Sequence, residues 1–105
     1  MPTPKPKKPG FKYVSLWYKF VHLGTYNHVE VQAKPAIKDG IWVHVIFPSG
    51  RHWDWYESTD SHGHWAKFFR VYRNTYSGNS NVAYVTVQLW HGAKTAKTFR
   101  KFYLV

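Results

Sequence analysis

The stretch IWVHVIFPSG, residues 41–50, decides the fold class of this chain. Its first seven residues are β-branched or aromatic apart from one histidine, and Pro48-Ser49-Gly50 follows at once. Such residues suit a pleated, half-buried strand, and proline and glycine then favour a turn. Similar runs return at 81–90 and 95–105. The sequence therefore predicts an all-β domain without long helices.

Side-chain alternation divides the 41–47 strand into two faces. The core-facing set consists of Ile41, Val43, Val45 and Phe47. The opposite set is Trp42, His44 and Ile46, which is apolar enough to be partly covered or to bind something. Alternation predicts further strands at 29–33, 51–56, 65–71, 83–89 and 95–105, with a polar loop at 58–63 and a turn at 77–81. The alternation slips at 99–101, which predicts a β-bulge.

The segment Phe11–Leu23 is apolar but poorly periodic. A helix would gather Trp17, Phe20 and Val21 on one side, but tyrosine, valine and phenylalanine suit strands better, so one or two edge strands are preferred. About seven short strands with frequent turns are typical of a β-sandwich.

Bulk properties limit the partners and the domain organisation. The 105 residues suffice for one core, and the formal net charge of +10 favours polyanionic partners. The chain has no cysteine, which excludes disulfides, Cys-based zinc sites and thiol catalysis. Neither a signal peptide nor a transmembrane segment is predicted. Residues 1–10 alternate proline with lysine and threonine, so they predict a flexible linker before a single domain at 11–105.

The order of motifs resembles the immunoglobulin-like, or fibronectin-III-like, domains of secreted and cell-surface bacterial proteins. The pieces are VEVQAKP, a strand running into PSG, DSHG before an aromatic strand, and GAKTA at the start of the last strand. They span about residues 25–105, although Trp, His and Lys are more frequent here than in such domains. The resemblance implies a non-catalytic extracellular module, an immunoglobulin-like β-sandwich of about seven antiparallel strands in two sheets. It leaves the ligand open.

Aromatic residues form the candidate ligand-binding surface, because Trp and Tyr rings stack on sugars and bases and hold cations. The set is Trp42, His44, Trp53, Trp55, Tyr56, Tyr84 and Trp90. The alternative is that these rings cover the outer sheet or form a small second core against residues 11–23. For the string RHWDWY at 51–56, the pattern favours burial of at least one of Trp53 and Trp55.

Cations provide the second part of the candidate site. Lys97 and Arg100 lie on the last predicted strand, and Lys67 and Arg70 lie on the strand at 65–71. If these strands share a sheet, their cations form one stripe beside the aromatics and suit an anionic polymer. The alternative is a row of lysines that protects an edge strand from aggregation.

Metal binding and catalysis have little support in the sequence. A possible metal cluster comprises His52, His62 and His64 with Asp54 and Asp60. Histidines in loops are usually solvated, so no metal site and no cofactor are predicted. The chain has five carboxylates, and no pair of them has the surroundings of an acid/base couple. No nucleophile motif or phosphate-binding glycine loop is present, so no enzymatic activity is predicted.

We therefore expect a non-catalytic accessory module of a secreted or cell-surface bacterial protein, joined to other domains of a larger parent. The expected ligand is an anionic or glycan polymer, such as cell wall or polysaccharide. Two alternatives remain open: a spacer or protein-interaction domain with no small ligand, and a module that binds single-stranded DNA.

Overall fold

The computed structural model describes residues 8–75, 78 and 80–105, and nearly all of them lie in strands or tight turns. The elements are β1 (Gly10–Leu16), β2 (Phe20–Val21), β3 (Tyr26–Lys34), β4 (Gly40–Ile46), β5 (His52–Ser58), β6 (His64–Arg70), the short 3-10 helix η1 (Arg73–Thr75), β7 (Val82–His91) and β8 (Lys94–Leu104). The predicted all-β character is confirmed. The strands number eight rather than about seven, because the 11–23 segment forms both β1 and β2.

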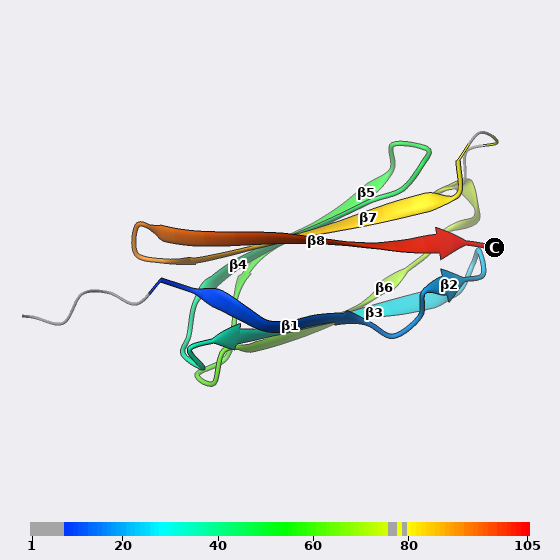
Figure 1. Cartoon of the computed structure of the whole chain (residues 1–105). Helices are drawn as coiled ribbons and strands as arrows, with labels where there is room; N and C mark the ends of the chain where they lie inside the picture. The colour runs from blue at the N-terminus through cyan, green and yellow to red at the C-terminus, as the bar shows by residue number, and fades with distance from the viewer. Residues whose placement is uncertain (1–7, 76–77, 79) are drawn as a thin grey trace, which may run out of the picture.

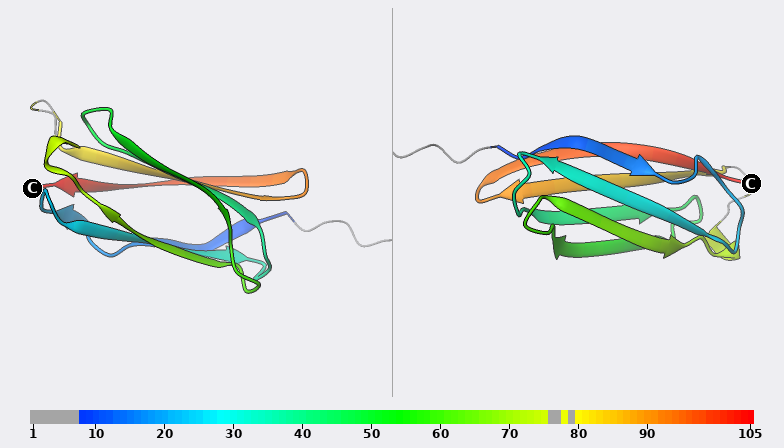
Figure 2. Two further views of the ribbon diagram at one scale, coloured as in Figure 1. Left: turned by 180° about the vertical axis from the view of Figure 1, so that it is seen from behind. Right: turned by 90° about the horizontal axis from the view of Figure 1, so that it is seen from below.

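The strands form two facing sheets in a sandwich-like arrangement (Figures 1 and 2). One sheet has three strands in the order β1-β3-β6, and the other has five in the order β2-β8-β7-β4-β5. Neighbouring strands are antiparallel, except that the short β2 runs parallel to β8. The linker predicted for residues 1–10 lies mostly outside the described residues, and β1 begins at Gly10.

The core lies between the sheets and follows the predicted alternation. In the five-stranded sheet Val43 pairs with Val87 and Val45 with Val85, and all four side chains are fully buried. Val29 and Val31 of β3 meet them from the other sheet, together with Phe69 of β6. Removal of this apolar surface from water is the main stabilising contribution to such a fold. The prediction that one face of 41–47 is core-facing is therefore confirmed.

A tight turn sets the register of β4 against β5. The Phe47 amide donates to the Arg51 carbonyl at 2.8 Å, and the Gly50 amide donates to the Phe47 carbonyl at 2.9 Å. Gly50 has a φ of +89°, a region that residues with a Cβ seldom adopt. The resulting register places His44 directly opposite Asp54 and Trp42 opposite Tyr56. This turn therefore determines which side chains of β4 and β5 meet on the outer face.

Two expectations from the sequence are wrong. The register of β7 against β8 is continuous, so there is no bulge at 99–101, and the irregularity lies instead in β1 between Phe11 and Tyr13. The apparent slip arises because Phe99 points outward while Arg100 points to the inner side, at the edge of the sandwich. The strands β6 and β8 also lie in different sheets, so their cations do not form one stripe. The turn expected at 77–81 lies partly outside the described residues.

Candidate binding surface

Five of the predicted site residues lie on the outward-facing side of the five-stranded sheet. We call it the outer face. It consists of the side chains that alternate with the buried ones on β4, β5, β7 and β8: Trp42, His44, Ile46, His52, Asp54, Tyr56, Tyr84, Thr86, Gln88, Trp90, Lys97, Phe99, Lys101 and Tyr103. Tyr56, Phe99 and Tyr84 are 73%, 62% and 52% exposed. Exposed apolar area of this kind usually marks an interaction site.

Rings on the outer face line up across the strands. Trp42 stacks on Tyr56 with centroids 5.9 Å apart and an interplanar angle of 22°, and on His44 at 5.5 Å and 27°. At the β8 end, Tyr103 stacks on the exposed Phe20 of β2 at 5.5 Å. Because neighbouring strands hold these rings in register, the face offers aromatic planes with polar edges in fixed positions.

Lysines of β8 lie over these rings. The Lys97 Nζ is 5.9 Å from the Trp42 ring centroid and 5.8 Å from that of Phe99, and the Lys101 Nζ is 6.0 Å from that of Tyr103. Such contacts hold a cation near an aromatic plane while leaving it open to solvent. The face therefore combines stacking surfaces with positive charge.

The carboxylates do not neutralise this charge. Each of the five has a partner within the fold: Asp39 with His91, Glu30 with His64, Glu57 with Lys67, Asp54 with His44 and His52, and Asp60 with the backbone amides of His62 and His64. Lys67 alone among the described Lys and Arg residues forms an ion pair with a carboxylate. Much of the positive charge is thus available to an external anion.

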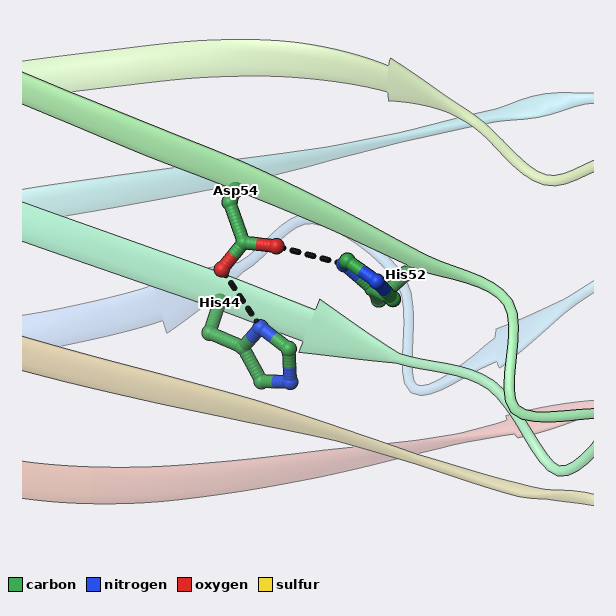
Figure 3. Close-up of side chains that lie close together, drawn as sticks. All are labelled: His44, His52 and Asp54. Carbon is green, nitrogen blue, oxygen red and sulfur yellow. Dashed lines mark hydrogen bonds and ion pairs between the residues drawn. The ribbon is translucent and has the colours of Figure 1, made fainter.

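Asp54 is the one carboxylate on the outer face, and it lies between two histidines (Figure 3). Its Oδ1 is 2.7 Å from the Nδ1 of His44, and its Oδ2 is 2.5 Å from the Nδ1 of His52. The Trp42 Nε1 also donates to Oδ1, at 3.1 Å. Desolvation raises the pKa of Asp54, but the hydrogen bonds from His44, His52 and Trp42 outweigh it, so the pKa lies below its ordinary value.

This arrangement corrects the metal cluster considered from the sequence. His52 and Asp54 do lie together, but their third partner is His44 of the neighbouring strand rather than His62 or His64. His64 contacts Glu30 through its Nε2 at 2.6 Å, on the other sheet. Asp60 accepts hydrogen bonds from the backbone amides of His62 and His64, not from their rings. Strand pairing decides which histidine lies beside which carboxylate, and the spacing of these residues along the chain does not reveal it.

Trp90 depends on a glycine for its place on the outer face. Gly40 is paired with Trp90 across β4 and β7, and a Cβ on Gly40 would fall 2.0 Å from the Cε2 of the Trp90 ring. The indole therefore lies directly over the glycine backbone. A residue without a side chain is needed at position 40 to keep this ring flat on the sheet.

Five of the predicted binding residues lie away from the outer face, four of them at the edge between β5 and β6. Trp53 and Trp55 point to the inner side of β5 and pack against the core at the open edge between β5 and β6. There the Trp53 Nε1 donates to the Arg70 carbonyl at 3.0 Å, and Arg70 lies over the Tyr72 ring at 5.3 Å. Lys67 pairs with Glu57 at 2.9 Å, across the same edge. A lateral groove of about 320 Å³ lies at this edge and is lined by Tyr26, Trp53, Trp55, Phe68, Phe69, Arg70 and Tyr72.

Arg100 lies at the opposite edge. Its Nε donates to the Val14 carbonyl of β1 at 3.1 Å, so it joins the two sheets where β8 passes β1. Of the predicted binding residues, the outer face thus brings together Trp42, His44, Tyr84, Trp90 and Lys97. The prediction that at least one of Trp53 and Trp55 is buried agrees with the structure in part, since both are half-buried.

Sequence reasoning did not include Phe99 and His52 among the binding residues of this surface. The irregular alternation at 99–101 left the face of Phe99 undecided. Phe99 and Arg100 are neighbours in β8, and their residue types alone do not reveal which of the two side chains faces solvent.

The comparisons with known proteins supply no relative. Neither a family model nor a curated protein nor a solved structure matches the chain. Among the described residues no helix has the length and apolarity needed to cross a membrane. Function is therefore inferred from the outer face itself.

Proposed function

We propose that this chain is a non-catalytic, immunoglobulin-like module of a secreted or cell-surface bacterial protein that binds an anionic or glycan polymer through the outer face. The observation that carries the proposal is the combination of in-register aromatic rings with Lys97 and Lys101, neither of which is paired with a carboxylate. Rings supply sequence-tolerant stacking, and the lysines supply long-range attraction for an anionic chain. An open, solvent-exposed surface suits an extended polymer better than a small molecule.

Strand order supports the immunoglobulin-like part of the proposal. In that fold the first, second and fifth strands share one sheet, and the third, sixth and seventh share the other. Here β1-β3-β6 and β4-β7-β8 have this division, with β5 added beside β4 and β2 beside β8. The departures are the absence of a partner strand beyond β6 in the described residues and an outward-facing tryptophan, Trp42, on β4.

The test is the affinity for a fluorescently labelled acidic polysaccharide, measured by anisotropy at low and moderate salt, with a neutral polysaccharide and single-stranded DNA as further arms. We expect saturable binding to the acidic polymer that falls about tenfold or more between about 50 and 200 mM salt, if two or more charges are neutralised. Equal affinity at both salt concentrations would remove the electrostatic part. Preference for single-stranded DNA would favour the nucleic-acid alternative.

Two pairs of variants place the site. Lys97→Gln with Lys101→Gln should reduce both the affinity and its salt dependence, whereas Lys12→Gln with Lys34→Gln removes the same charge from the other sheet and should have a smaller effect. Phe99→Ala or Tyr84→Ala should weaken binding by about 1 kcal/mol or more if a ligand ring stacks there. Tyr26→Ala is the control, since Tyr26 is 56% exposed but borders the lateral groove. Loss of binding in the control pair alone would contradict the proposed site.

A further inference from the structure

We propose that His44, His52 and Asp54 form a binding site for a divalent transition-metal ion of the Zn²⁺ class on the outer face. The inference does not depend on the polymer-binding proposal. Each residue offers one ligand atom, and the three atoms all lie within 4.8 Å of one another. Among the residues that the structure describes, this is the one group of three or more histidine or acidic side chains with that property.

The donor atoms converge from two paired strands. His44 lies directly opposite Asp54, and His52 is two residues before Asp54 on the same strand, so all three side chains leave the same face. Both imidazoles turn their Nδ1 toward the carboxylate, at 2.7 and 2.5 Å (Figure 3). Around a tetrahedral ion with bonds of about 2.1 Å, ligand atoms are about 3.4 Å apart. The carboxylate–imidazole separations need to widen by less than about 1 Å to admit the ion.

The ligand chemistry selects the class of metal. Imidazole nitrogen suits Zn²⁺, Cu²⁺ and Ni²⁺, whereas Ca²⁺ and Mg²⁺ require mainly oxygen ligands. Three protein ligands leave at least one coordination position for water or an external ligand, as in open zinc sites. The His52 side chain is 55% exposed, so solvent reaches this ligand and the ring has room to turn.

The surroundings resemble a supported metal site. The Trp42 Nε1 donates to Asp54 Oδ1 at 3.1 Å and orients the carboxylate, which is the usual role of an outer hydrogen bond around a metal ligand. The His44 ring is held between Trp42 and His52, with centroids 5.5 and 5.3 Å away. Strands β4 and β5 are paired along their whole length, and ligands on paired strands are placed more rigidly than ligands on loops.

Two other histidine–carboxylate contacts provide an internal comparison. His64 meets Glu30 at 2.6 Å and His91 meets Asp39 at 3.0 Å, but each contact has a single imidazole. Each of these pairs offers two ligand groups, one imidazole and one carboxylate, and cannot hold an ion without further ligands. The positive net charge of the chain opposes cation binding. At physiological ionic strength, however, charges more than about 8 Å from the site are largely screened. A difference in metal affinity between the three-residue site and these pairs therefore reports the local geometry of the ligands.

The experiment is a titration of the untagged full chain with Co²⁺ and Zn²⁺, using Co²⁺ visible absorption and calorimetry for stoichiometry. We expect one ion per chain and intense d–d bands typical of low coordination number. His44→Gln, His52→Gln and Asp54→Asn should each weaken binding by about tenfold or more, and Trp42→Phe should weaken it by about tenfold through the outer hydrogen bond. His64→Gln and His91→Gln are the controls and should bind as the parent does.

Unfolding curves of each variant show whether it folds, and His52→Gln is the safest test because that side chain is the most exposed of the three. Absence of stoichiometric binding to the parent chain would overturn the inference. So would binding that persists in folded His52→Gln and Asp54→Asn but is lost in His64→Gln or His91→Gln.

Discussion

The two sides of strand β5 use similar residues for different purposes. On the inner side, Trp53 and Trp55 stack with centroids 6.1 Å apart and pack against the core at the open edge of the sandwich. On the outer side, Tyr56 is 73% exposed and continues the ring row of the outer face. We expect the inner rings to stabilise the fold and the exposed Tyr56 ring to contribute little to it. An aromatic residue in a small β domain therefore shows its role only after its face is known.

Hydrogen bonding makes the same distinction. The inner-side Trp53 donates its indole N–H to the Arg70 carbonyl of β6, and Trp65 of β6 donates to Glu57 of β5. No backbone ladder joins β5 to β6, so these contacts and the Lys67–Glu57 pair close the edge. On the outer face, Tyr84 and Phe99 have no comparable role. We expect substitutions at the edge to change stability and substitutions of exposed outer-face side chains, such as Tyr84 and Phe99, to change binding.

The largest effect expected from this comparison is that of Trp55→Ala. The ring contacts Trp65 and Phe69, with centroids 6.1 Å from each, so its removal leaves a cavity at the edge. We expect a loss of about 3 kcal/mol in the free energy of unfolding, at the lower end for a large aromatic residue because Trp55 is half-buried. Tyr56→Ala is the matched control and should cost less than about 1 kcal/mol in urea unfolding. Equal losses would mean that the two sides of β5 do not differ.

A smaller effect should follow from Gly40→Ala. The new Cβ would overlap the Trp90 ring, and displacement of such a ring in a packed position costs about 1–3 kcal/mol. Adding Trp90→Ala removes the overlap, so the double variant should be less destabilised than the sum of the single variants. Strict additivity in urea unfolding would show that Trp90 does not lie over Gly40.

The ion pair at the β5–β6 edge should contribute less again. The Lys67 ammonium lies 2.9 Å from Glu57 and lowers the pKa of that carboxyl. Both side chains are about one-third exposed, so we expect a coupling of about 0.5 kcal/mol in a double-mutant cycle of Glu57→Gln and Lys67→Gln. The coupling should shrink in high salt. A coupling that persists unchanged in 1 M salt, where screening acts within about 3 Å, would indicate that packing and not charge joins the two side chains.

The smallest effect concerns Asp60, in the turn between β5 and β6. Backbone hydrogen bonds from His64 and then His62 lower the pKa of Asp60 in the folded state. A lowered folded pKa stabilises the fold above the unfolded value of about 3.9, and this contribution is lost as the pH falls through the folded pKa. Asp60→Asn should therefore be less stable than the parent at pH 7, and the difference should narrow in acid. A difference independent of pH would show that ionisation of Asp60 contributes nothing.

Prediction from the sequence succeeded where one face of a strand is strictly aliphatic. The valines of 41–47 and 83–89 identify the inner face, so the outward positions of Trp42, His44 and Tyr84 follow. It left Trp53 and Trp55 undecided, because 51–56 has aromatics on both faces and alternation alone gives no sign of which face is inner. The sheet partner of 65–71 and the meeting of His44 with Asp54 depend on long-range pairing, which local pattern does not contain.

Nitrogen-15 NMR of the chain titrated with an acidic polysaccharide tests the central claim most directly, because the indole N–H signals report separate regions. The account predicts that the Trp42 and Trp90 signals, with the backbone amides of β4, β7 and β8, shift on binding. The Trp53 and Trp65 signals, whose indole groups are hydrogen-bonded to Arg70 and Glu57 at the β5–β6 edge, should stay in place. Shifts confined to that edge, or no shifts with any polymer, would contradict the assignment of the outer face as the binding surface.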